Sequence, residues 1–277
     1  MPRGLPLPWS RMRSSPRVLL LVAGAAVLAV AVVLGVTLAT RQTPAQPKAL
    51  AGKPPIPSPL PTPVAGQIRA AFRAWPHGTI ATLQTLAAAR PRDAAVQLSL
   101  GLALLYAGYD ADAVTALRAA KTRGRDTPIE IQADSLLHPQ YFPGYPLFVY
   151  TGPNFLLDRG STLQAEGHQH SAERFYLRAA GEEPRNAEAQ VAAAVGRFDK
   201  DDLTPAFSHL GPLTVRFPRN QTVRYYLGLL LAWTAQGDAA VAQFKQAVAL
   251  DPRSPLGRNA AEFLQRLQQV RTSTTRK

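Results

Sequence analysis

Apolar residues recur at a helical period from Val64 to the end of an amphipathic segment at residues 255–270. Segments 64–75 and 79–89 carry this pattern, and each stops at a Pro-containing triplet, as helices commonly do. A stretch rich in Pro and aromatic residues, 128–152, interrupts the pattern. The sequence therefore predicts an all-α chain of short paired helices with one interruption.

Residues 153–254 carry a repeat of 34 residues. Each unit ends in a Pro-Arg-Asn or Pro-Arg-Ser triplet, with an Ala twelve residues before the Pro and a small residue twelve before the Ala. The members are Pro184, Pro218 and Pro252; Ala172, Ala206 and Ala240; and Gly160, Ala194 and Gly228. This spacing resembles the tetratricopeptide repeat (TPR), a helix-turn-helix unit.

The resemblance implies a TPR-type helix-turn-helix solenoid. A small residue on the first helix lets the second helix approach closely, and a larger side chain at the Ala would overpack by about 1–3 kcal/mol. One helix pair cannot bury its apolar face alone, so pairs stack on each other. Block 153–254 supplies three pairs, and the amphipathic helix within 255–277 caps the last one.

Block 64–127 supplies two more pairs. The first is degenerate, because Gln67 and Thr79 stand where a small residue and Ala are expected. The second follows the TPR pattern closely, with Leu100-Gly101 and, twelve residues after the Gly, Ala113. We therefore expect about five helix pairs in all.

The interruption at 128–152 is dense in apolar rings. It holds Tyr141, Phe142, Tyr145 and Phe148. Such a segment is costly to leave in water, so we expect it to pack over the solenoid. It is either a structural plug between the two repeat blocks or a recognition loop over the groove.

The N-terminal residues predict a membrane anchor. A basic tail, 1–17, precedes a transmembrane helix at 18–40, in which Val18–Leu38 runs 21 residues without a charge. A Pro-rich linker, 41–63, follows and favours extended backbone. The basic tail indicates a single-pass protein in the cell membrane with an extracytoplasmic repeat domain. The alternative is a cleaved signal peptide.

Composition narrows the possible functions. The chain has no Cys, which excludes disulfides and thiolate sites. Its net charge is +13, but residues 1–53 hold seven Lys or Arg and no acidic residue. Because the excess flanks the apolar segment, it fits a membrane rather than a nucleic acid, and we expect no nucleic-acid partner.

Candidate catalytic and metal-binding motifs are weak. His168-Gln169-His170 has no third ligand nearby and is interpreted as an exposed turn. Asp199, Asp201 and Asp202 lack the Gly and distal Glu of a calcium loop and are interpreted as a polar turn. No nucleophile or phosphate-loop motif stands out. We therefore expect no catalysis, no cofactor and no metal.

The resemblance also implies a ligand groove. TPR ligands contact first-helix positions two, five, nine and twelve, which correspond here to Leu98, Leu102, Leu105, Asn154, Leu157, Ser161, Gln164, Glu188, Val191, Val195, Phe198, Tyr225, Leu229 and Ala232. The lining is mostly apolar and lacks the Lys/Asn/Arg set that holds a terminal carboxylate in chaperone-binding members. It suits an apolar or amphipathic segment. The alternative is a groove filled by the insert or by the chain's own helices.

Together these features predict a non-catalytic, membrane-tethered scaffold that binds a protein or peptide partner through the solenoid. Assembly or maturation of envelope proteins is one setting for it. Two alternatives stay open. One is a secreted or periplasmic binding module released by signal cleavage, and the other is an enzyme with its site in loop 138–152.

Overall fold

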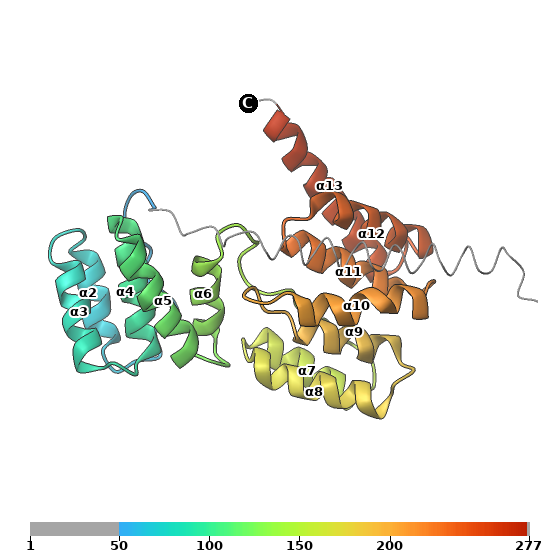
Figure 1. Cartoon of the computed structure of the whole chain (residues 1–277), viewed down its shortest axis with the longest axis horizontal. Helices are drawn as coiled ribbons and strands as arrows, with labels where there is room; N and C mark the ends of the chain where they lie inside the picture. The colour runs from blue at the N-terminus through green and yellow to red at the C-terminus, as the bar shows by residue number, and fades with distance from the viewer. Residues whose placement is uncertain (1–49, 276–277) are drawn as a thin grey trace, which may run out of the picture.

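The computed structural model describes residues 50–275 (Figure 1). Within this range the chain forms twelve helices and no strand, which confirms the all-α prediction. The helices are α2 (Ala65–Arg73), α3 (Thr79–Ala89), α4 (Ala94–Ala107), α5 (Asp110–Arg123), α6 (Pro128–Leu137), α7 (Phe155–Ala165), α8 (Gln169–Glu182), α9 (Ala187–Gly196), α10 (Thr204–Arg216), α11 (Gln221–Trp233), α12 (Gly237–Leu250) and α13 (Pro255–Thr275).

The predicted tail 1–17 and transmembrane helix 18–40 lie outside the described residues, as does the linker before Leu50. Between residues 50 and 275, no helix combines the length and the apolar character needed to span a bilayer.

The last residue of each Pro-Arg-x triplet caps the helix that follows. The side-chain oxygens of Asn186 and Asn220 accept hydrogen bonds of 2.9–3.3 Å from amides in the first turns of α9 and α11. Asp93 and Ser254 do the same before α4 and α13. Because the first amides of a helix have no intrahelical acceptor, these caps determine where each pair begins.

Small residues allow the two helices of a pair to approach closely. A methyl group added to Gly101 on α4 would lie 2.7 Å from Leu117 on α5, and one on Gly228 on α11 would lie 2.9 Å from the ring of Phe244 on α12. Ala113, Ala172, Ala206 and Ala240, on the second helices, are fully buried. The glycines therefore act through packing.

The buried apolar residues form two separate clusters. One joins α2 to α6, and the other joins α7 to α13 together with Tyr145 and Phe148 from the insert. Figure 1 shows the same division, with the α2–α6 group at one end and the α7–α13 group at the other. At the far end, Phe263 on α13 stacks on Phe244, with ring centroids 5.2 Å apart. The fold is thus a repeat-like helical array in two blocks.

Candidate functional site

The side chains predicted to line a groove are almost all buried. Leu98, Leu102, Leu105, Leu157, Gln164, Val191, Val195, Phe198, Tyr225 and Leu229 each expose 7 % or less, and Ser161 is half-buried. Segments of the chain itself cover part of this surface in both blocks.

In the second block the cover is the insert segment, defined as Tyr145–Tyr150. It has no regular secondary structure, and its side chains alternate in exposure from Pro146 to Val149. Phe148 is buried with its ring centroid 5.0 Å from that of Tyr226 on α11 and 5.5 Å from that of Tyr176 on α8. Tyr145 packs edge-on against Phe198 at 5.8 Å. Two aromatic side chains thus anchor the segment to the helices.

Helix side chains also bind the backbone of the insert segment. Gln164 on α7 accepts the Phe148 N–H through Oε1 at 2.7 Å and donates from Nε2 to the Pro146 carbonyl at 3.1 Å. The Tyr226 hydroxyl accepts the Val149 N–H at 2.9 Å, and Ser161 Oγ accepts that of Tyr150 at 3.4 Å. We call the surface lined by Ser161, Gln164, Tyr176, Phe198 and Tyr226 the C-terminal face.

The Gln164 amide is held in place by a buried network. Its Nε2 also donates to Gln169 Oε1 at 3.0 Å, and Gln169 donates in turn to the Gly196 carbonyl at 3.0 Å. The Tyr176 hydroxyl donates to Gln164 Oε1 at 3.2 Å. Because α7, α8 and α9 all contribute, the amide is oriented toward the insert by the fold.

The four aromatic residues predicted to contact the solenoid differ in their surroundings. Tyr145 and Phe148 are buried. Tyr141 is half-buried and stacks on His138, with centroids 6.0 Å apart. The ring centroids of Phe142 and Trp233 lie 5.8 Å apart, yet half of Phe142 is exposed.

In the first block the cover is the end of the Pro-rich linker. Pro54 and Pro57 are buried, and Gln132 on α6 donates to the Ser58 carbonyl at 3.0 Å. The Leu50 N–H donates to the Leu105 carbonyl at 3.1 Å. Beside this linker an apolar hollow of about 530 Å³ remains, lined in part by Leu98, Leu102, Ile131, Leu136 and Pro143. We call this surface the N-terminal face.

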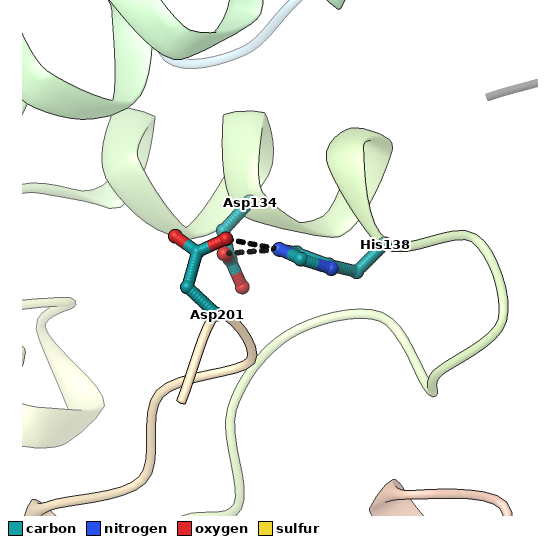
Figure 2. Close-up of side chains that lie close together, drawn as sticks. All are labelled: Asp134, His138 and Asp201. Carbon is teal, nitrogen blue, oxygen red and sulfur yellow. Dashed lines mark hydrogen bonds and ion pairs between the residues drawn. The ribbon is translucent and has the colours of Figure 1, made fainter. Parts of the chain in front are cut away.

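Next to the insert, three carboxylates converge on the ammonium of Lys121. Its Nζ lies 2.7 Å from Asp134 on α6, and 3.2 and 2.5 Å from Asp199 and Asp201 in the loop after α9. His138, at the end of α6, places Nε2 2.9 Å from Asp201 and 3.5 Å from Asp134 (Figure 2). This cluster joins the two blocks.

The pKa shifts follow from burial and charge. Burial alone would lower the pKa of Lys121, but the carboxylates of Asp134, Asp201 and Asp199 raise it above the ordinary value. The hydrogen bond with His138, together with Lys121, lowers the pKa of Asp201 despite partial burial. Burial lowers the pKa of Lys200, with Asp134 opposing it only in part. Asp201 and Lys121 therefore stay charged at neutral pH.

Asp134, His138 and Asp201 are also a candidate metal set within the described residues. Their ligand atoms lie within 4.8 Å of one another. However, the Lys121 ammonium already contacts both carboxylates and supplies the positive charge they need. We therefore assign the cluster as an ion-pair network.

A second polar contact joins the blocks nearby. The Asp126 carboxylate accepts the Ser171 N–H at 2.9 Å, and the backbone carbonyl oxygen of Asp126 lies 2.7 Å from Nδ1 of His168. His170 Nε2 lies 2.9 Å from Glu130. The interpretation of His168-Gln169-His170 as an exposed turn is therefore wrong, because the turn is partly or fully buried against the end of the first block.

No protein-family model, no curated protein and no solved structure matches this chain. Its contacts are therefore the basis for any assignment of function.

We call the Lys121 cluster and the Asp126 and Glu130 contacts together the junction. It was not predicted from the sequence, although one feature of the sequence pointed to it. Asp134 lies next to Ala133 on a helix that buries Ile129, Ala133 and Leu137, and it is fully buried with them. A carboxylate among buried apolar positions requires a charged partner. Only the fold identifies that partner as Lys121.

Proposed function

We propose that the protein is a non-catalytic scaffold that binds an extended segment of another protein on a TPR-type helical solenoid. In this proposal Val18–Leu38 tethers it to the membrane and the repeats lie outside the cytoplasm. The setting we favour is the assembly or maturation of envelope proteins.

One observation carries the proposal. In each block an irregular segment of the chain lies on the helices and is held partly through its backbone, by Gln132 in the first block and by Gln164 and Tyr226 in the second. Backbone groups are common to all peptides, so side chains that bind them are suited to recognising an extended chain. Apolar contacts at Phe148 and Pro57 supply burial.

The polar chemistry of the described residues supports a binding role over catalysis. The most concentrated group of charges, around Lys121 and Asp134, is engaged in ion pairs. A catalytic acid or base needs access to substrate as well as a suitable pKa. Asp134 has no access to a substrate, because its side chain is fully buried.

A peptide-display selection against the purified full chain tests the proposal. A library of random dodecapeptides is selected on wild type, and the enriched peptides are then measured on two variants. Leu102→Asp alters the N-terminal face and Gln164→Ala alters the C-terminal face, while Arg219→Ala, on an exposed residue, is the matched control. We expect peptides that bind wild type and the control and lose about tenfold or more on one face variant. The absence of enriched peptides, or peptides indifferent to both faces, would contradict the proposal.

A further inference from the structure

We propose that the C-terminal face is a binding site for an extended segment with an aromatic–Pro–x–aromatic sequence from another protein, and that Tyr145–Phe148 is the internal occupant that such a segment replaces. This inference rests on the proposed scaffold function and names its ligand class.

The recognition pattern is read from the contacts of the occupant. The first aromatic, Tyr145, packs on Phe198 and lies 5.7 Å beneath the Lys200 ammonium. Pro146 is buried and its carbonyl accepts from Gln164, whereas the next side chain, Leu147, is 45 % exposed. A ligand thus needs an aromatic and a Pro, followed by any residue.

The second aromatic position is the most selective. Phe148 is 1 % exposed and lies among the rings of Tyr150, Tyr176 and Tyr226. Its N–H is bound by Gln164, so side chain and backbone are recognised together. A buried aromatic anchor beside a backbone hydrogen bond is typical of sites that bind extended peptides.

Replacement of the occupant requires its two ends to move off the face. Gly144, with φ of 75°, and Gly152 flank it, and residues 151–153 are exposed. Its outer side chains are poorly covered: Val149 exposes 66 % and Leu147 45 % of its surface. A peptide that belongs to a larger partner protein can have its outer side chains covered by that protein, and so buries apolar surface that the occupant leaves exposed.

An internal occupant lowers the apparent affinity for an external ligand, because only the fraction of molecules with an open face can bind. The test therefore compares wild type with chains whose occupant is weakened. Phe148→Ala removes the main anchor. Val149→Pro removes the N–H bound by Tyr226 while changing an exposed side chain, so it leaves the aromatic contacts in place.

The probe is a fluorescent peptide with the sequence Gly-Tyr-Pro-Leu-Phe-Val-Tyr-Thr-Gly-Pro, that of residues 144–153. Binding to the full-length chain is followed by fluorescence anisotropy. We expect Phe148→Ala and Val149→Pro to bind it about tenfold or more tightly than wild type. Adding Gln164→Ala to either variant, or replacing the peptide's Phe by Ala, should reverse the gain.

The result that overturns this proposal is an absence of binding to both weakened variants at about 1 mM peptide, or binding that does not depend on Gln164 and the peptide's Phe. If Phe148→Ala does not fold, as judged by circular dichroism, Val149→Pro decides the outcome. Display-selected peptides that bind only the N-terminal face would leave the scaffold function intact while this inference fails.

Discussion

The glycines on the first helices are there for packing, and this can be tested at a single residue. A Cβ on Gly228 would lie 2.9 Å from the buried ring of Phe244, whereas one on the exposed Gly181 meets nothing within 4 Å. We expect Gly228→Ala to lower the free energy of unfolding by about 1–3 kcal/mol through overpacking. Gly181→Ala should leave it unchanged or raise it by up to about 1 kcal/mol.

Urea unfolding followed by circular dichroism measures both variants. Equal effects of the two substitutions would show that close packing is not the reason for the Gly at 228.

The two lysines beside Asp134 should respond differently to loss of charge. Lys121 neutralises three carboxylates, so Lys121→Met leaves Asp134 buried without its closest cation and should cost about 3–5 kcal/mol. Lys200 is fully buried at its side chain, 3.7 Å from Asp134, and within the described chain its Nζ has no hydrogen-bond partner. Because burial already lowers its pKa, Lys200→Met should be neutral or stabilising by about 1 kcal/mol.

Guanidinium unfolding at neutral pH compares the two lysine variants. A loss on Lys200→Met as large as that on Lys121→Met would mean that both cations hold the junction.

At the scale of the helix, the repeat carries its own start signal. Asn220 caps α11 through the Val223 N–H at 3.1 Å, so Asn220→Ala should cost about 0.5–2 kcal/mol. The adjacent exposed Arg219→Ala should change stability by less than about 0.5 kcal/mol. Thermal unfolding separates the two, and an Arg219 effect equal to that of Asn220 would contradict the role of the cap.

Helices were predictable from sequence because their signals are local. The period of apolar residues, Gly228 and the Pro-Arg-Asn triplets act within one 34-residue unit, and the structure places helices where they indicate. The junction was not predictable, because Lys121 meets Asp199 and Asp201 across 78 and 80 residues. Neither motif nor period links residues so far apart.

The insert segment was predictable from the sequence only in part. Its aromatic composition indicated packing against the helices, and Phe148 does pack there. Its path was not predictable, because it depends on single side chains such as Gln164 and Tyr226 that bind backbone atoms. A Gln on a helix gives no sequence signal that separates this role from an ordinary buried amide.

At the scale of the whole molecule, polar side chains join the two apolar clusters, and Ile131 on α6 also packs against the second cluster. Asp126 and Glu130 bind the start of α8, and the Lys121 network binds the loop after α9. Because charged groups contribute to this contact, the coupling between the blocks should depend on pH, whereas each apolar cluster should not.

Asp201 gives the sign of the dependence at low pH. Its pKa is lowered in the folded chain from the ordinary 3.8, so its carboxylate stabilises the junction above pH 3.8, and this contribution is lost as the pH falls below that value. Lys121, whose pKa is raised above the ordinary 10.5, keeps its contribution below pH 10.5 and loses it only at higher pH. Lys121 and Asp201 therefore add no pH dependence of their own between these limits.

Asp201→Asn should therefore lower the melting temperature between pH 5 and 8, and the difference from wild type should shrink steadily below about pH 4. Asp202→Asn is the matched control, because Asp202 accepts a hydrogen bond from the Thr204 amide, which an Asn can also do, and has no contact with Lys121.

Hydrogen exchange at pH 6 adds the structural readout. In Asp201→Asn, protection should fall in α6 and at Phe148 and Val149, while α3, α4 and α11 keep theirs. Equal loss of protection across both blocks would show instead that the two clusters unfold as one unit and that the charged junction does not set their coupling.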